Sequence, residues 1–371
     1  IVVRLDLAAD GVAHDYTIDL RAALDRREGA PIGGLVIRWE SGAEARIESI
    51  DLLGRTWRFE DRWGVGSERA AGETRPVVYL SSPGSLSWEL EGSWNDARLS
   101  FALAEAVPGQ TTRVRLDLAG PGRARRLAEF DLAGGEAWRD HEIVLGEVDL
   151  DGAQLVLSVG DSAGSPTGSG VVLWAAPVLW EPPARRFNVL ILLEDALRAD
   201  RMSVYGHHRE TTPFKTELFA DGVRFERCIA QATKTRFSCP SMMTSLRPFA
   251  TGVWGIWNRN PRLEEGYVTL AEVLASRGWA TASFLQNGNA GPDNGLDQGF
   301  GRVVENLPGR ADGVYGGKAL DWIRRVGDRN FFGYLHVAEP HAPYAPPGPQ
   351  RRWEDVIMSD SGPPRWSEQA R

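Results

Sequence analysis

The stretch NVLILLEDALRAD, residues 188–200, decides the fold. It begins with a short apolar run, Val189 to Leu193, and continues into two adjacent acids, Glu194 and Asp195. The run is too short to cross a membrane and predicts a fully buried strand of a parallel sheet. In open α/β sheets, ligands bind beyond the carboxyl ends of the strands. The two acids are therefore expected where a cation or a substrate would bind.

Downstream of this stretch, predicted strands and helices alternate. Thr212-Pro213 predicts the start of one helix, and Thr269 with Glu272 forms a capping box at the start of another. The other predicted elements are strands at 280–285 and 331–337 and a helix at 318–326. This alternation predicts a βαβ-type parallel sheet.

Upstream, short runs with period-two alternation are separated by Gly, Asp and Pro, which predicts antiparallel strands in β-sandwiches. The predicted domain organisation is a β-rich region at 1–84, interpreted as a truncated sandwich, a jelly-roll-like sandwich at 85–180, a stiff linker at 181–186, and an α/β domain at 187–371. The pattern of the upstream half is similar to that of the jelly-roll modules that accompany many bacterial carbohydrate-active hydrolases.

Tryptophan is frequent in the upstream half, and two interpretations of it are open. Exposed tryptophans on a sandwich often bind sugars, whereas aromatic residues within strands usually fill the core. We expect the core role for Trp88, Trp94, Trp138 and Trp174.

Composition restricts the partners. A formal net charge of -8 argues against non-specific attraction to nucleic acid or anionic lipid, so an anionic substrate needs a local device such as a metal. The two cysteines are too few for a disulfide framework. The sequence has no segment of membrane-spanning length and no signal peptide. It begins at Ile1 without Met, and we expect both ends to be incomplete, which leaves targeting and membrane anchoring undetermined.

Three segments carry candidate chemistry. The first is the acid pair Glu194-Asp195. The second is the hydroxyl-rich segment 231–241, which precedes a predicted helix at 241–246. A hydroxyl near a helix N-terminus suits attack on an anionic ester, and a divalent cation would lower its pKa. The third is YLHVAEPHAPY, residues 334–344, in which His336 ends a strand and His341 is a candidate proton donor to a leaving oxygen.

These motifs, together with those that continue them, resemble the N-terminal half of sulfatases in the alkaline phosphatase superfamily. The resemblance covers about residues 187 to 345 in family order. The continuing motifs are Val204-Tyr205-Gly206, Thr211-Thr212-Pro213, DGVRF at 221–225, TSLRP at 244–248, GLDQGF at 295–300 and FFGYLHVAEPHAPY at 331–344. The resemblance implies an alkaline phosphatase/sulfatase-like α/β domain, incomplete at its C-terminus, preceded by the all-β sandwich region.

The resemblance also implies roles for three residues. Asp195 matches the first metal-ligand aspartate, Thr235 falls at the nucleophile position and next to the metal, and His341 matches the active-site histidine of a Pro-His-x-Pro segment. Because Thr235, Phe237 and Cys239 stand where the family's nucleophile, Pro and Arg would be, conversion to formylglycine is not expected. A shifted register that begins at Ser238 restores the Pro but lacks the Arg.

Two further departures concern the metal. Glu194 stands where many members have a second aspartate, which leaves Asp195 as the firm ligand. The family's later metal pair, an Asp with His or Asn followed by Gly, has no counterpart before Arg371, so we expect the chain as given to lack half of its active site. Secondary candidates are Glu194, Lys234, Arg236, Ser238, Asn287 and His336.

The sequence therefore predicts a metal-dependent hydrolase of sulfate esters, with one divalent ion. That ion would be Ca²⁺ in a sulfatase-like site and Zn²⁺ or Mn²⁺ in a phosphodiesterase-like site. One alternative is a phosphodiesterase, phosphatase or phosphotransferase that uses Thr235. Another is a non-catalytic glycan-binding protein. The expected partner is an anionic ester, with a sulfated glycan as one candidate and no nucleic acid, and the resemblance implies an extracytoplasmic location.

Overall fold

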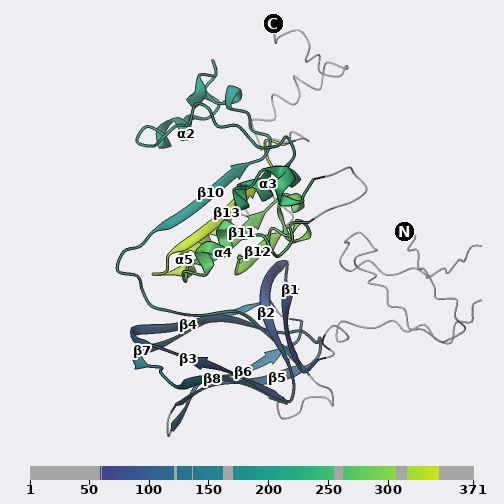
Figure 1. Ribbon diagram of the computed structural model, residues 1–371, viewed down its shortest axis with the longest axis vertical. Helices are drawn as coiled ribbons and strands as arrows, with labels where there is room; N and C mark the ends of the chain where they lie inside the picture. Colours follow the sequence, from purple (N-terminus) through teal and green to yellow (C-terminus); the bar gives the residue numbers. More distant parts are fainter. Residues whose placement is uncertain are drawn as a thin grey trace, which may run out of the picture. The chain divides into compact units, whose positions relative to one another are not determined.

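The structure is a computed structural model that describes residues 59, 61–120, 123–135, 137–161, 170–254, 262–305 and 316–341 (Figure 1). Strands predicted before residue 59 and the part of the Pro-His-x-Pro segment beyond His341 lie outside the described residues. Within this part of the chain, no helix has the length and hydropathy of a membrane span.

The upstream part of the described chain is an all-β sandwich. One of its layers is β1-β2-β9-β4-β7, in which β1 pairs with β2, and the other is β3-β8-β5-β6. The strands are β1 Trp63–Ala70, β2 Glu73–Ser81, β3 Gly84–Leu90, β4 Ser93–Glu105, β5 Thr111–Gly120, β6 Arg123–Ala133, β7 Arg139–Asp149, β8 Ala153–Asp161 and β9 Val171–Trp180. All pairings within the two layers are antiparallel, as the period-two alternation predicts.

Tryptophan side chains contribute to the sandwich core. Trp174 is buried between the layers, and its ring centroid lies 4.8 Å from that of Trp88 in an edge-to-face arrangement. Trp138 is also buried, and its indole Nε1–H donates to the carbonyl of Glu73. The core role expected for Trp138 and Trp174 is therefore confirmed, and Trp88 is half-buried but packs against this core. Trp94 is half-buried and is not part of that cluster.

The predicted boundary at residue 84 falls at the first residue of β3, just after the chain passes from one layer to the other. β2, before the boundary, pairs with β9 through Val77–Ala175 to Ser81–Val171, and β3, after it, pairs with β8. We propose that the described sandwich begins at β1 rather than at residue 85. The division of the chain into domains stays a prediction.

The downstream part is an α/β fold in which β10, β13, β11 and β12 run parallel in that order. On the far side of β12, β2 pairs with it antiparallel. The elements are β10 Asn188–Glu194, η2 Ala199–Arg201, η3 Ser203–Tyr205, α2 Pro213–Leu218, α3 Thr235–Thr244, η4 Pro248–Thr251, α4 Leu270–Ala275, β11 Ala280–Leu285, η5 Gly288–Ala290, η6 Pro292–Asn294, β12 Arg302–Glu305, α5 Gly316–Val326 and β13 Phe331–Val337.

Side chains alternate between the two faces of β13, because successive strand residues point in opposite directions. Phe332 and Tyr334 pack in the cluster that contains Cys239 and Met243 of α3, whereas Phe331 packs with Trp322 of α5. This alternation places helices on both faces of the parallel strands. The parallel sheet of βαβ type that the sequence predicts is therefore present. The capping box at the start of α4 is also present, since Thr269 and Glu272 exchange both hydrogen bonds.

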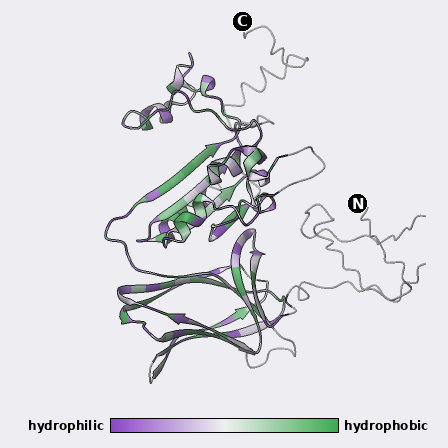
Figure 2. Cartoon of the chain, viewed as in Figure 1, coloured by the Kyte–Doolittle hydropathy of each residue, from purple (hydrophilic) through white to green (hydrophobic). Residues whose placement is uncertain are grey.

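The burial predicted for β10 is wrong. The strand is parallel to β13, but Leu190 and Leu192 are each about half exposed, at 51% and 52%. The physical reason is its place at the edge of the sheet, where β13 is its partner among the described strands. Figure 2 shows that β10, at this edge of the sheet, is coloured mainly as hydrophobic.

The helix predicted at 241–246 begins earlier and ends earlier, at Thr235 and Thr244. Pro240 suggests a later start because proline lacks the N–H that a helix interior needs. It nevertheless lies inside α3, where Cys239, Pro240, Ser241 and Met243 are buried. Packing of this face outweighs the lost backbone hydrogen bond. The helix therefore starts at the hydroxyl-rich segment.

Candidate active site

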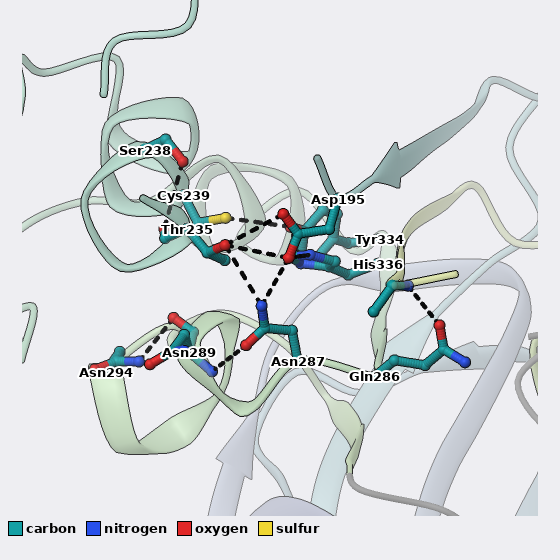
Figure 3. Close-up of polar contacts among 11 residues, drawn as sticks. Asp195, Thr235, Ser238, Cys239, Gln286, Asn287, Asn289, Asn294, Tyr334 and His336 are labelled. Carbon is teal, nitrogen blue, oxygen red and sulfur yellow. Dashed lines mark hydrogen bonds and ion pairs between the residues drawn. The ribbon is translucent and has the colours of Figure 1, made fainter. Parts of the chain in front are cut away.

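Four polar side chains meet at one edge of the sheet (Figure 3). Three come from the carboxyl ends of β10, β11 and β13, and the fourth comes from the start of α3. Asp195 follows β10 directly, and its backbone N–H donates to the carbonyl of Val337 at the end of β13, over 2.8 Å. This bond fixes the aspartate at the edge of the sheet. The site thus forms where ligands bind in open α/β sheets.

Thr235 is the first residue of α3, and its hydroxyl faces Asp195. Oγ1 of Thr235 donates to the carboxylate, with distances of 3.2 Å to Oδ2 and 3.4 Å to Oδ1. The N-terminus of a helix carries partial positive charge. A negative charge on Thr235 or on a group bound to it would therefore be favoured at this position.

Asn287 joins the two residues from the end of β11. Its Nδ2 donates to Asp195 Oδ2 over 2.7 Å and lies 3.4 Å from Thr235 Oγ1. Its Oδ1 accepts the backbone N–H of Asn289 over 3.0 Å, as a cap of η5. Because Oδ1 is used as an acceptor, the amide orientation is fixed with the NH₂ group toward the carboxylate.

His336 lies on the other side of the carboxylate and is fully buried. Its Nε2 is 3.3 Å from Asp195 Oδ2. Burial lowers the pKa of His336, and the nearby carboxylate only partly opposes this effect. A neutral imidazole beside Asp195 follows from this balance.

The pKa of Asp195 reflects two opposed effects. Burial raises it, but the hydrogen bond from Asn287 and the interactions with His336 and Thr235 together lower it by more than burial raises it, so the net pKa lies below the ordinary value. Asp195 is therefore ionised near neutral pH. An ionised carboxylate can bind a cation or accept a hydrogen bond that orients a hydroxyl.

Comparison with a family model identifies the segment that carries this site. Residues 187–357 match the family model described as Sulfatase. This segment is sulfatase-like. It begins one residue before β10 and includes all four residues of the site, Asp195, Thr235, Asn287 and His336.

Similarity to individual proteins is partial. Human arylsulfatase A is 32% identical over 123 residues, which cover 32% of this chain and 23% of that protein. Bovine arylsulfatase A is 33% identical over 97 residues, or 25% of this chain and 19% of that protein. The chain thus spans about a quarter or less of the curated relatives it matches.

Solved structures are similar at a lower level. One is a protein in complex with its substrate D-glucosamine-2-N,6-O-disulfate, with 19% identity over 48% of this chain and 39% of that chain and a TM-score of 0.38. Another is a family 29 carbohydrate-binding module, with 10% identity over 31% of this chain and 72% of that chain and a TM-score of 0.21.

Glu194 of the sulfatase segment points to a different partner. Its Oε2 forms an ion pair with Nζ of Lys215 at the start of α2. The carboxylate is thereby neutralised by a lysine rather than directed at Thr235. Asp195 and Glu194 are adjacent in sequence but have separate environments.

The remaining candidates lie around α3 and after β13. Lys234 precedes the helix, and its carbonyl accepts the N–H groups of Phe237 and Ser238. Arg236 is half-buried in the first turn, and Ser238 Oγ donates to the carbonyl of Thr235 over 3.4 Å. His341 is exposed, and its backbone N–H donates to the carbonyl of Ala338. The roles of these residues stay predictions.

The donors around Asp195 match a hard divalent cation in type but not in number. Asp195 and Thr235 supply carboxylate and hydroxyl oxygens, which Ca²⁺ prefers, but calcium takes about six to eight oxygens. Within the described residues, no cluster of three or more His, Cys, Asp or Glu side chains is arranged to hold a metal. These residues alone therefore provide only part of a calcium ligand set.

Sequence reasoning missed three side chains that support the site. Tyr334 and Cys239 lie behind His336, and Gln286 accepts the N–H of Ala338 over 2.5 Å while donating to Glu339 over 3.0 Å. For Tyr334, the available signal was its spacing of two residues from His336, which places both side chains on the same face of β13. Cys239 and Gln286 had none, because their contacts come from other elements.

Proposed function

We propose that the protein hydrolyses sulfate esters with Thr235 as the nucleophile. The match of residues 187–357 to the sulfatase family model supports this general activity. The observation that carries the assignment to Thr235 is its hydrogen bond to Asp195, 3.2 Å long, at the first residue of a helix. A hydroxyl in this setting has an orienting carboxylate on one side and a positive helix end on the other.

In the proposed reaction, Thr235 Oγ1 attacks sulfur in line with the leaving oxygen. A bond forms between Oγ1 and sulfur, the bond between sulfur and the ester oxygen breaks, and the hydroxyl proton ends on the leaving alcohol. Water then attacks the sulfuryl-threonine, which releases sulfate and restores the hydroxyl. His341 is the proposed residue that assists departure of the leaving oxygen.

The hydrogen bonds around Thr235 prepare it for attack. Its hydroxyl donates toward Asp195, while Asn287 Nδ2 approaches its oxygen at 3.4 Å. The direction of the O–H bond is therefore set, and an oxygen lone pair is left for the ester. Positioning of this kind removes part of the entropic barrier to reaction.

We further propose that the activity depends on one divalent ion, with Ca²⁺ as the first choice. Asp195 and Thr235 would contribute to its ligands, and the remaining oxygens would come from outside the described residues. When bound, such an ion neutralises charge on the ester. The low pKa of Asp195 supports its role as a ligand.

A phosphoester hydrolase or phosphotransferase is the second candidate. The observation that favours it is Thr235 itself, because an unmodified threonine alkoxide next to a metal suits attack on phosphorus as well as on sulfur. We propose an anionic ester as the substrate in either case. A sulfated glycan and an extracytoplasmic location are proposed with the sulfatase assignment.

The test is turnover of an aryl sulfate and an aryl phosphodiester by the full-length protein, with Ca²⁺, Mn²⁺ or Zn²⁺ added after chelation. The proposal predicts turnover of the sulfate, restored by Ca²⁺. Preference for the phosphodiester with Mn²⁺ or Zn²⁺ would support the second candidate. A folded protein that turns over neither ester with any of these ions would contradict both and favour a glycan-binding protein.

A further inference from the structure

A cluster of charged side chains lies where β2 meets β12. Glu73 and Arg75 come from β2, Asp140 comes from β7 and Arg302 comes from β12. The side chains of Arg75 and Arg302 are only 5% and 11% exposed. Arginine is almost never buried this deeply unless it is paired, so the arrangement of the four side chains needs an explanation.

Each arginine contacts both carboxylates. Nη1 of Arg75 lies 2.5 Å from Oδ1 of Asp140, and its Nη2 lies 2.9 Å from Oε2 of Glu73. Nη2 of Arg302 lies 2.6 Å from Oδ2 of Asp140, and its Nε lies 3.3 Å from the same oxygen of Glu73. The four side chains therefore form a closed charge ring, in which two positive and two negative charges balance.

The strand register explains why both carboxylates are needed. β12 pairs antiparallel with β2 through Val303–Thr74, and the next position of this register sets Arg302 opposite Arg75. Like charges directly opposite each other on neighbouring strands are destabilising. Burial and then Arg75 lower the pKa of Arg302, and the two carboxylates only partly oppose this effect. The carboxylates thus supply the charge that allows two arginines to lie across from each other.

The charge ring connects the sandwich with the α/β fold. β7 belongs to the sandwich, β12 belongs to the parallel strands, and β2 pairs with strands of both. The Trp138 ring lies 5.3 Å from the guanidinium carbon of Arg75, and its Nε1–H donates to the carbonyl of Glu73 over 3.0 Å. Nη1 of Arg325, on α5, lies 3.6 Å from Oδ2 of Asp140. Elements of both parts therefore meet at this ring.

A second group of contacts joins the same two parts. Trp180 is the last residue of β9 and is buried. The guanidinium carbons of Arg98, on β4, and Arg329, after α5, lie 5.4 and 5.3 Å from its ring centroid. Arg329 also donates to the carbonyl of Gly278, which follows α4, over 3.2 Å. The charge ring is therefore not the sole link between the sandwich and the α/β fold.

We propose that the charge ring couples the sandwich and the sulfatase-like segment into one cooperative folding unit, so that neither part opens without the other. Opening between β2 and β12 would separate Arg302 from both carboxylates at once. Ion pairs that are buried are screened little by water and salt, so this loss is large. The sandwich is then part of the scaffold that supports β12 and β11, and it is not a mobile module on the linker at 181–186.

The test is hydrogen exchange of the full-length protein, followed by mass spectrometry at increasing urea concentrations. Peptides from β4 and β9 report on the sandwich, and peptides from β11 and β13 report on the α/β fold. The proposal predicts that, in wild type, the two sets of peptides converge on the same free energy of opening. Two separate values that persist up to complete unfolding would overturn it.

Asp140→Asn changes the ring from the sandwich side. Because hydrogen bonds to charged groups are lost, exchange should become about 10-fold faster or more in both sets of peptides. Asp117→Asn is the matched control, since Asp117 pairs with Arg126 inside the other sandwich layer and its side chain is 24% exposed, against 38% for Asp140. The control should change exchange by less than about five-fold. An effect of Asp140→Asn confined to β4 and β9, or an equal effect of the control, would overturn the proposal.

Arg302→Gln changes the ring from the other side and should accelerate exchange in β4 and β9 as well as in β11 and β13. If this variant does not fold, Arg302→Lys takes its place, because lysine keeps the charge but lacks the rigid fork that bridges two carboxylates. An increase confined to β11 and β13 would again overturn the coupling. Exchange needs neither a substrate nor a metal, so failure of this proposal and failure of the proposed reaction are distinguishable.

Discussion

The side-chain amide of Asn287 lies 2.7 Å from Oδ2 of Asp195, although the two residues are 92 positions apart in the sequence. The bond connects the ends of β10 and β11, which are separated in the sheet by β13. It also fixes the carboxylate next to Thr235. Asn287 therefore positions the carboxylate of Asp195.

Replacing Asn287 by Ala should lower kcat/KM for the ester that the protein hydrolyses by about 10- to 100-fold. The reason is that a hydrogen bond to a charged group contributes roughly 1.5–3 kcal/mol. The pKa of Asp195 should rise, since Asn287 is the first of the hydrogen bonds that lower it. Steady-state kinetics check the first effect. Asn289→Ala is the control, because Asn289 is exposed and contributes its backbone N–H, which the variant keeps. Equal kinetics in the two variants would contradict the role of Asn287.

Asp195 and Glu194 provide a second comparison within one dipeptide. Asp195→Asn removes the charge that faces Thr235, whereas Glu194→Gln removes a charge already paired with Lys215. We expect Asp195→Asn to lower activity by about 10²-fold or more, which is the usual scale for a metal-site or orienting group, and Glu194→Gln to change it only a few-fold. Calorimetric titration with Ca²⁺ should show weakened binding only in Asp195→Asn. A larger loss in Glu194→Gln would show that Glu194 is the ligand.

The sandwich contains a carboxyl group with a pH-dependent effect on stability. Burial raises the pKa of Glu105, and hydrogen bonds from Thr112, Val107 and Val171 only partly oppose this. The folded protein therefore retains this proton to a higher pH than the unfolded chain does, in which the pKa of Glu is about 4.3. The contribution to stability is complete below the unfolded pKa and declines as pH rises through the window up to the folded pKa.

Glu105→Gln should remove this decline, because a neutral amide keeps an acceptor for the N–H groups of Val107 and Val171. The measurement is the Tm from about pH 4 to pH 7, a range that begins near the unfolded pKa. Glu89→Gln on the exposed face of β3 is the control. The account is wrong if Glu105→Gln and wild type show the same dependence of Tm on pH.

Much of this site could be predicted from the sequence because its residues follow local patterns. The apolar runs before Asp195 and Asn287 indicate strands, and parallel strands end at one edge of a sheet. The matching strands are β10 and β11. Family resemblance added the position of Thr235, which periodicity could not supply.

The missed features depend on contacts between elements. The apolar pattern of β10 does not state how many neighbours the strand has, so the exposure of Leu190 and Leu192 could not be predicted. Likewise, Cys239 reaches Tyr334 only through the packing of α3 against β13. A one-dimensional pattern gives the face of each element but not the side chains that meet across faces.

The most direct test of the central claim compares Thr235→Ala with Thr235→Ser in the full-length protein on an aryl sulfate. Serine keeps the hydroxyl that faces Asp195, whereas alanine removes it. We predict that Thr235→Ser retains measurable turnover and that Thr235→Ala loses on the order of 10³-fold or more, the scale expected for loss of a nucleophile. Turnover by Thr235→Ala close to that of wild type, in the same folded state, would contradict the claim that Thr235 attacks the ester.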